Sequence, residues 1–409
     1  MTHSGDDRTL LSTRISPRDL AALTDATRDF IREEIQPLEE AAKGDIEAAG
    51  GDRVRVKMQH AAKAAGVFAP QVASEFGGHN LNMVDRVPIF EEAGYSLFGP
   101  LALNVAAPDE GNIHLLQHVA NEEQRDRYLR PLARGEFRSA FAMTEPAPGA
   151  GSDPSALRSH ARRVDRGWVL SGHKHFITGA DGVDFYLFMA RTKGMPGDRG
   201  GATMFLVPAD TPGIELVRHL ETIDRSMIGG HCELTFTDVW VPDEAILGDI
   251  DLGFDFAQWR LGPARMTHVM RWLGAARRAH DIALAYVVNR RGFGRALGEL
   301  GMTQQLIADN EIDLAATRAL LMTACSKLDG GESASQATSI AKVFGAEAIC
   351  RVVDRSMQMC GGLGMTDDLM VARIYREVRP FRVYDGASEV HRWAIAKRAF
   401  SMARTQYGG

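Results

Sequence analysis

Residues 232–242 of the 409-residue chain read CELTFTDVWVP, and the alternation in this stretch decides the fold class. Cys232, Leu234 and Phe236 would share one face of a β-strand, and the polar residues between them would share the other. Two earlier segments are also rich in β-formers: GWVLSGHKHFITGADGVDFYLFMART (167–192) and ATMFLVPADTPGIELV (202–217). Several such segments in succession predict an antiparallel sheet or barrel, which we assign to residues 138–250.

The pattern is helical on both sides of this β zone. The segment SPRDLAALTDATRDFIREEI (16–35) offers Ser16 as an N-cap and Pro17 as the first helical residue. Two long amphipathic segments, 303–331 and 333–362, each end at a pair of glycines. The sequence therefore predicts a mainly α fold with a central β domain: an N-terminal helical domain (1–137), the β domain (138–250) and a C-terminal helical bundle (251–409).

Composition narrows the class of partner. The net charge is −6 and no long basic run occurs, which argues against nucleic acid. No stretch is apolar for long enough to cross a bilayer, and MTHSGDDRTL (1–10) lacks the apolar core of a signal peptide. The four cysteines lie far apart without CxxC spacing, so we expect buried thiols in a cytoplasmic protein, with no disulfide frame and no metal site.

Several familiar catalytic motifs are absent from the sequence. No GxGxxG follows a strand and opens a helix, and there is no P-loop, HExxH or GxSxG. The segment FAMTEPAPGAGSD (141–153) joins the first helical zone to the β zone. Its small residues allow a flat ligand to approach the backbone, and Thr144 and Ser152 offer hydroxyls, although such composition is also typical of an interdomain linker.

A second segment of interest, RVYDGASEVHRW (382–393), places Asp385 in an Asp-Gly turn. On local rules alone, such an aspartate is usually a solvated turn residue. The two segments acquire a chemical meaning only together with three others: SGHKHFITGA (171–180), RRGFG (290–294) and QMCGGLGM (358–365).

These five segments, in this order over nearly the whole chain, resemble the acyl-CoA dehydrogenase family. APDEGN, RLGPARMTHVMRWLG and YDGASEVH are similar to the branch that in animals is fused to a kinase-like domain. The resemblance implies an N-terminal helical domain, a β-barrel-like middle domain and a C-terminal four-helix bundle. It also implies FAD, bound between the β domain and the bundle and completed by a neighbouring subunit.

The family pattern also implies which residues contact FAD. Those carried over for the flavin are Phe141, Met143, Thr144, Gly151, Ser152, Phe176 and Thr178. Those carried over for the adenosine diphosphate part, from a second subunit, are Arg290, Phe293, Gln358, Gly361 and Gly362. Ala387 and Glu389, which follow Asp385, are carried over as further flavin contacts. Glu389 stands where the family usually has Gln.

Asp385 aligns with the family's catalytic base. The resemblance implies that it removes the α-proton of an acyl-CoA thioester while flavin N5 takes the β-hydride, giving the trans-2-enoyl-CoA. Relatives that place the base on another helix would have it at Ala264, and alanine cannot serve. We expect an apolar, substrate-filled pocket to raise the pKa of Asp385. Substrate contacts carry over to Ser152, Arg265 and Gly386.

Other functions remain open on the sequence alone. An acyl-CoA oxidase, a nitroalkane oxidase-like enzyme that also uses an aspartate base, and a non-catalytic FAD-binding module would share the fold. Electron-transferring flavoprotein is the expected electron acceptor, and a homodimer or homotetramer the expected assembly. The acyl chain is not fixed by the sequence, and no role follows from it for His391, Asp109 or Glu110.

Overall fold

Residues 14–407 are described by the computed structural model of the chain, so the segment 1–10 that bears on a signal peptide lies outside them. The first part is helical. Ser16 caps its first helix, since its Oγ accepts the Asp19 N–H at 3.1 Å, and Pro17 follows as predicted. The elements are α1 (Pro17–Phe30), η1 (Ile31–Ile35), α2 (Gln36–Ala41), α3 (Ile46–Ala49), α4 (Asp52–Ala64), η2 (Ser74–Phe76), α5 (Met83–Gly94), α6 (Gly99–Ala102), α7 (Asp109–Val119), α8 (Glu122–Gln124), η3 (Arg125–Leu129) and α9 (Arg130–Ala133).

An eight-stranded sheet follows, with the order β6-β7-β3-β2-β4-β5-β8 and with β1 paired to β4. Most neighbours are antiparallel, but β1 and β4 run parallel, and β2 meets β4 in parallel at one end. The sheet is therefore mixed, which strand alternation alone did not predict. The elements are β1 (Ser139–Ala142), η4 (Pro154–Ala156), β2 (His160–Val164), β3 (Gly167–Thr178), β4 (Phe185–Arg191), β5 (Ala202–Pro208), β6 (Ile214–His219), β7 (His231–Pro242), η5 (Asp243–Ala245) and β8 (Ile246–Leu247).

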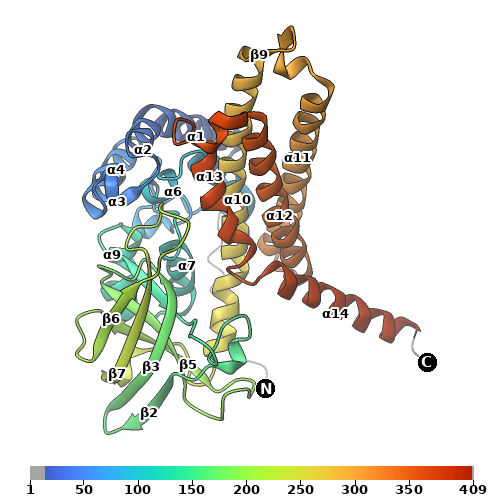
Figure 1. Cartoon of the computed structure of the whole chain (residues 1–409). Coiled ribbons are helices and arrows are strands. Elements are labelled where there is room, and N and C mark those ends of the chain that lie inside the picture. The colour runs from blue at the N-terminus through green and yellow to red at the C-terminus, as the bar shows by residue number, and fades with distance from the viewer. Residues whose placement is uncertain (1–13, 408–409) are drawn as a thin grey trace.

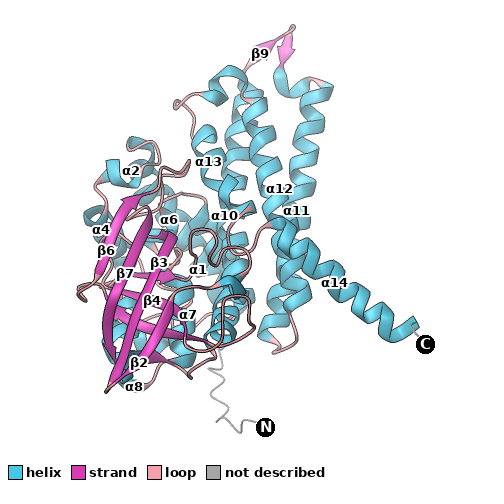
Figure 2. Cartoon of the chain, turned by 60° about the horizontal axis from the view of Figure 1, so that its bottom comes forward, coloured by secondary structure: helices cyan, strands magenta, loops and turns pink. Residues whose placement is uncertain are grey.

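The predicted faces of β7 are confirmed. Cys232, Leu234 and Phe236 are buried in a core that belongs to the sheet alone. Strand β4 is buried on both faces, because Phe188 joins that core while Leu187 joins the larger core shared with the helices. The sheet consequently carries helices on one face, beside the N-terminal domain (Figure 2).

The last part is a bundle of long helices. Its central helix α10 packs against α11, α12 and the N-terminal helix α5, and so ties the bundle to the first domain (Figure 1). The elements are α10 (Gly253–Asn289), β9 (Arg291–Gly292), β10 (Arg295–Ala296), η6 (Leu297–Glu299), α11 (Gly301–Asp329), α12 (Ser335–Met359), η7 (Gly361–Met365), α13 (Val371–Val378), η8 (Arg379–Arg382) and α14 (Ser388–Tyr407).

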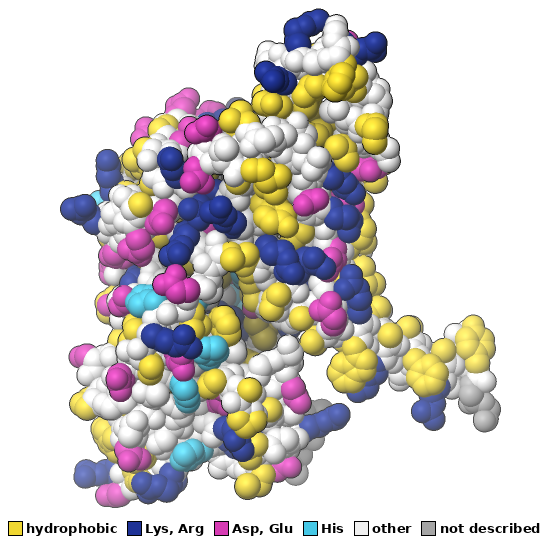
Figure 3. Space-filling view, viewed as in Figure 1, with side chains coloured by type: hydrophobic (Ala, Val, Ile, Leu, Met, Phe, Trp, Pro, Cys, Tyr) yellow, Lys and Arg dark blue, Asp and Glu magenta, His cyan; other side chains and the backbone are white. Residues whose placement is uncertain are grey.

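Helix α14 begins against α12, and its C-terminal part projects away from the rest of the chain (Figure 1); Figure 3 shows hydrophobic side chains along that part. Trp393, Phe400 and Met402 are each about two-thirds exposed or more. The four cysteines are free and buried, as predicted. Among residues 14–407, none of the helices combines the length and the apolar character that crossing a membrane requires.

Candidate active site

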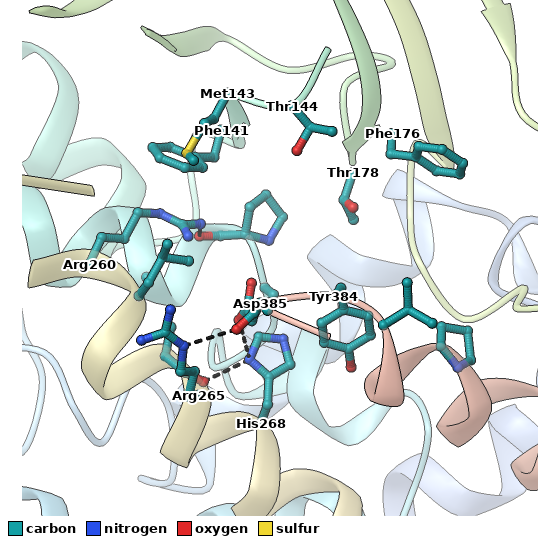
Figure 4. Close-up of a pocket in the computed structure, with 18 of the residues that line it drawn as sticks. Phe141, Met143, Thr144, Phe176, Thr178, Arg260, Arg265, His268, Tyr384 and Asp385 are labelled. Carbon is teal, nitrogen blue, oxygen red and sulfur yellow. Dashed lines mark hydrogen bonds and ion pairs between the residues drawn. The ribbon is translucent and has the colours of Figure 1, made fainter. Parts of the chain in front are cut away.

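A cavity of about 1530 Å³ lies where the helical parts meet the sheet. Residues from the β1–β2 loop, strand β3, helix α10 and the turn before α14 line it together, although they are far apart in the sequence (Figure 4). The predicted site residues on its wall are Phe141, Met143, Thr144, Gly151, Ser152, Phe176, Thr178, Arg265, Asp385 and Gly386. The predicted site residues that do not line it are Arg290, Phe293, Gln358, Gly361, Gly362, Ala387 and Glu389.

Asp385 points its carboxylate into this cavity (Figure 4). Its backbone has φ +53°, a left-handed conformation that is uncommon for any residue with a side chain. Its Oδ2 is buried and has no hydrogen-bond partner among the described residues. Buried polar atoms are nearly always paired, and an unpaired carboxylate oxygen in a cavity is an acceptor available to a proton of a bound molecule.

The charge of Asp385 is set by basic neighbours. Those that act on it are His268, Arg260, Arg265 and Lys342. Burial alone would raise the pKa of Asp385, but these positive groups lower it by more, so it lies below its ordinary value. The sequence predicted a raised pKa for a pocket filled by substrate. In the cavity of this structure the pKa is lowered, because of the basic side chains, which that prediction did not consider.

Three donors hold the backbone of the turn that carries Asp385. Lys342, which is fully buried on α12, donates from Nζ to the carbonyls of Phe381 (2.9 Å) and Gly386 (2.6 Å). Arg265 Nε donates to the carbonyl of Asp385 at 2.9 Å, and His391 Nε2 donates to the same oxygen at 3.1 Å. These contacts fix the position and direction of a residue whose backbone conformation is strained.

Gly386 is required by its place in this turn. Its φ is +93°, and a Cβ added there would lie 2.6 Å from Nε2 of His391. Glycine is therefore required after Asp385 for two reasons: the backbone is left-handed there, and His391 lies close to it. This gives His391, for which the sequence offered no role, a contact with the candidate base.

His268 lies beside Asp385 on the α10 side of the cavity (Figure 4). Its Nδ1 donates to the Ala264 carbonyl at 2.7 Å and lies 3.3 Å from Asp385 Oδ2. Burial lowers the pKa of His268 to about 4, so the imidazole is neutral at pH 7. At that pH the positive charges of Arg260, Arg265 and Lys342 still lower the pKa of Asp385.

The opposite wall of the cavity is built by the sheet (Figure 4). Phe176, at φ +54°, leaves 55% of its surface exposed, which is unusual for a large hydrophobic residue of a strand. The hydroxyls of Thr144 and Thr178 lie near it. An exposed aromatic face with two hydroxyls suits a flat, partly polar ring system, and the cavity volume exceeds that of an ordinary single-ligand pocket.

The loop that carries Met143 and Thr144 is held by a buried ion pair. Glu145 accepts Lys174 Nζ at 3.1 Å and the backbone N–H groups of Arg158 (2.7 Å) and Ser159 (2.8 Å). Lys174 is fully buried and also donates to the Met143 carbonyl at 3.1 Å. The pair is fully hydrogen-bonded, which is the condition under which buried charges are tolerated.

The residues predicted to contact FAD from a second subunit lie elsewhere. Arg290 and Phe293 flank β9, which stands at the end of the bundle away from the sheet (Figure 1). Phe293 is 89% exposed and has φ +51°. Gln358, Gly361 and Gly362 lie at the end of α12. These residues lie apart from the cavity lining, as a site shared between subunits would require.

No role could be predicted for Asp109 or Glu110, and no partner for Glu389. All three make contacts in the structure. Asp109 accepts the N–H and the hydroxyl of Ser139 and so links α7 to β1. Glu110 lines the cavity and accepts the hydroxyl of Thr267 at 2.9 Å. Glu389 is largely exposed, and Arg392 lies 3.8 Å from it.

Sequence reasoning did not find Arg260, His268 or Lys342. The first two share one face of α10 with Ala264, at i, i+4 and i+8, and that spacing was a usable signal. Lys342 gave none, because a lysine within a helix is usually exposed.

Comparison with known proteins agrees with this geometry. Family models of the acyl-CoA dehydrogenase N-terminal, middle and C-terminal domains match residues 17–136, 140–239 and 251–400. FadE2 of Mycobacterium tuberculosis, named a probable acyl-CoA dehydrogenase, is 36% identical, with 86% of each chain covered. The 3-(aryl)acrylate reductase of Clostridium sporogenes is 33% identical, with 90% of this chain and 95% of the reductase covered.

Two further similarities are to a relative from an animal and to a solved structure with the same fold. Acyl-CoA dehydrogenase family member 11 of Mus musculus is 34% identical over 90% of this chain and 49% of its own length, so the chain spans about half of that relative. The crystal structure of an acyl-CoA dehydrogenase from Geobacillus kaustophilus superposes with a TM-score of 0.82 at 26% identity, covering 94% of this chain and 99% of the other.

The fold and the cavity thus define an FAD-dependent oxidoreductase. The chain belongs to the acyl-CoA dehydrogenase family.

We predict that Glu145→Gln weakens FAD binding and lowers stability. Removing one partner of a buried pair leaves Lys174 uncompensated, which costs about 3–5 kcal/mol, and frees the loop carrying Thr144. The ratio of flavin to protein absorbance and the thermal midpoint measure both effects. Asp153→Asn is the matched control, since this exposed carboxylate of the same loop accepts hydrogen bonds from the N–H and the hydroxyl of Ser155 and none from Lys174. Equal flavin retention in the two variants would contradict the role of the pair.

Proposed function

We propose that the protein dehydrogenates an acyl-CoA thioester at its α,β-bond to the trans-2-enoyl-CoA, with Asp385 as the base. The observation that carries the proposal is the Asp385 carboxylate. It is ionised and aimed into a cavity whose facing wall bears Phe176, Thr144 and Thr178. Its Oδ2 has no hydrogen-bond donor among the described residues, although His268 Nδ1 lies 3.3 Å away. Bound FAD supplies the acceptor for the β-hydride.

Each group of the site has a defined task in this proposal. Oδ2 of Asp385 takes the α-proton. Lys342, Arg265 and His391 hold the carbonyls of the turn, so the carboxylate needs no reorganisation when the substrate arrives. The thioester lies between this turn and the flavin wall, beside Ser152 and Gly386.

The FAD site is completed, in this proposal, by a second copy of the chain. Arg290 would reach the pyrophosphate with its guanidinium fork, and Phe293 would pack beside the adenosine. Gln358, Gly361 and Gly362 would surround the same part of FAD, and Ala387 and Glu389 would follow the base beside the flavin. The exposed apolar side chains of α14 support a homodimer or homotetramer.

The wider context is inferred from chemistry. Enoyl-CoA formation is a step of fatty acid β-oxidation, and the electrons would pass to electron-transferring flavoprotein in the cytoplasm. A second candidate function is the reverse reduction of an aryl-conjugated double bond, which the relative from Clostridium sporogenes supports by its name. The same cavity serves either direction, since the groups that remove a proton also return it.

An anaerobic titration with a panel of acyl-CoAs tests the proposal. The flavin of the purified, FAD-loaded protein is expected to bleach with one class of acyl chain, which would also name the substrate. A flavin that bleaches only with a nitroalkane or another carbon acid would overturn the CoA assignment and retain Asp385 as the base. A flavin that is re-oxidised rapidly by air would favour an oxidase.

We predict that Asp385→Asn lowers the rate of flavin bleaching by about 10²–10⁴, because general-base catalysis contributes on this scale. The amide has the same shape, so FAD content should be unchanged. Stopped-flow absorbance under anaerobic conditions measures the rate. Asp25→Asn, on the exposed side of α1, is the control and should bleach at the wild-type rate. A fully active Asp385→Asn would eliminate this residue as the base.

We predict that Lys342→Met shifts the pH dependence of kcat/KM. Lys342 lowers the pKa of Asp385, so its loss raises that pKa. The base acts only when ionised, and the acid limb of the profile must therefore move to higher pH. Lys57→Met, exposed on α4, should leave the limb in place. A limb that does not move in Lys342→Met would show that the lysine only supports the backbone.

We predict that Arg290→Met weakens FAD binding roughly 10- to 100-fold, the effect of losing a charge-assisted hydrogen bond. Fluorescence titration of the apoprotein measures the affinity, and light scattering verifies that the assembly is unchanged. Arg291→Met is the control, since its side chain is the adjacent exposed guanidinium on β9. Equal affinities for the two variants would place the pyrophosphate elsewhere.

A further inference from the structure

Three polar groups on the sheet side of the cavity form a chain that the mechanism above does not use. Thr178 on β3 and His231 on β7 are cross-strand partners. Thr178 Oγ1 lies 2.9 Å from His231 Nδ1, and His231 Nε2 lies 2.8 Å from Asp224 Oδ2. All three residues line the cavity, and the side chains of Asp224 and His231 are 9% and 16% exposed.

The direction of each hydrogen bond follows from Asp224. Burial raises the pKa of Asp224, but its hydrogen bond to His231, and the positive charge of His231 when that ring is protonated, lower it by more, so the carboxylate is ionised at neutral pH. A carboxylate only accepts, and therefore His231 donates from Nε2. The tautomer that carries its single proton at Nε2 has a lone pair at Nδ1, and this lone pair accepts the hydroxyl proton of Thr178. The Thr178 oxygen is left with its lone pairs toward the cavity.

A neighbouring acid protects this arrangement. Glu377 on α13 accepts the Arg225 N–H and the Ser226 hydroxyl, each at 2.6 Å. Burial and the charge of Asp224 together raise the pKa of Glu377 to about 7. When one of the two carboxyl groups is protonated, Glu377 takes the proton and Asp224 keeps its charge.

We propose that His231, held in one tautomer by Asp224, is a positioning residue that turns the Thr178 hydroxyl so that its oxygen, and not its proton, faces the flavin. The inference rests on the proposed function, which places the flavin on the wall of Phe176 and Thr178. The ring nitrogens of an oxidised flavin that accept hydrogen bonds become N–H donors on reduction. A Thr178 oxygen that accepts a hydrogen bond from such an N–H stabilises the reduced ring. The hydrogen-bonded series Asp224, His231 and Thr178 therefore raises the flavin reduction potential.

The test is the reduction potential of the FAD-loaded protein, measured by dye-coupled spectroscopic titration. His231→Phe frees the Thr178 proton to face an oxidised ring. We expect the reduced form to lose about tenfold in the redox equilibrium, or ~30 mV for a two-electron couple. His231→Asn is the conservative rescue, since its Oδ1 can stand where Nδ1 stood, and it should stay close to the wild-type potential.

Asp224→Asn tests the tautomer with the histidine in place. An amide can donate to Nε2, which moves the imidazole proton to Nδ1 and reverses the bond to Thr178. The potential should again fall. His173→Phe is the matched control: this histidine is on the same strand as Thr178, bonds the Glu233 carboxylate at 2.7 Å and does not line the cavity. Its potential should equal that of the wild type.

The decisive result is a double-mutant cycle. If His231 acts through Thr178, its effect on the potential vanishes in a Thr178→Val background. An equal shift from His231→Phe in both backgrounds would overturn the inference, as would wild-type potentials in both His231→Phe and Asp224→Asn. If the His231→Phe variant does not retain FAD, the reduction potentials of Asp224→Asn and His231→Asn are compared in the wild-type and Thr178→Val backgrounds instead. A wild-type protein that binds no FAD would instead overturn the proposed function.

Discussion

The buried ammonium of Lys342 is the interaction on which the site depends. It reaches from α12 to the carbonyls of Phe381 and Gly386, on either side of Asp385. Burial lowers the pKa of Lys342 to about 8, because keeping the ammonium charged inside the protein costs free energy of desolvation. The same charge holds the turn and lowers the pKa of Asp385, which joins the geometry of the candidate base to its protonation state.

Helix α10 organises the rest of the cavity around that turn. One face of the helix brings Arg260, Ala264 and His268 to the cavity, while the neighbouring Arg265 bonds the Asp385 carbonyl. The sheet supplies the facing wall, on which Phe176 and Thr178 are fixed by pairing between β3 and β7. Opposed walls from two different architectures allow a base and a flavin to approach one bond from opposite sides.

Much of the fold could be predicted from local patterns, and less of the site. Alternation in 232–242, the Ser16 cap and the glycines that end α11 and α12 are short-range signals, and each was confirmed. The parallel pairing of β1 with β4 depends on residues about 45 positions apart and has no local signal. The basic groups that lower the pKa of Asp385 come from α10 and α12, and Arg265 was the one among them that the sequence predicted. The raised pKa expected for a substrate-filled pocket therefore differs from the lowered pKa in this cavity.

The most direct test of the central claim is an isotope effect on flavin reduction. In the proposed mechanism, Asp385 removes the α-proton as the flavin is reduced. Anaerobic stopped-flow reduction with an α-deuterated acyl-CoA, of the chain class that bleaches the flavin, should be several-fold slower than with the unlabelled thioester, and the effect should persist across neutral pH. Equal rates with the two thioesters, together with a slowing only by β-deuteration, would contradict removal of the α-proton by this carboxylate in that step.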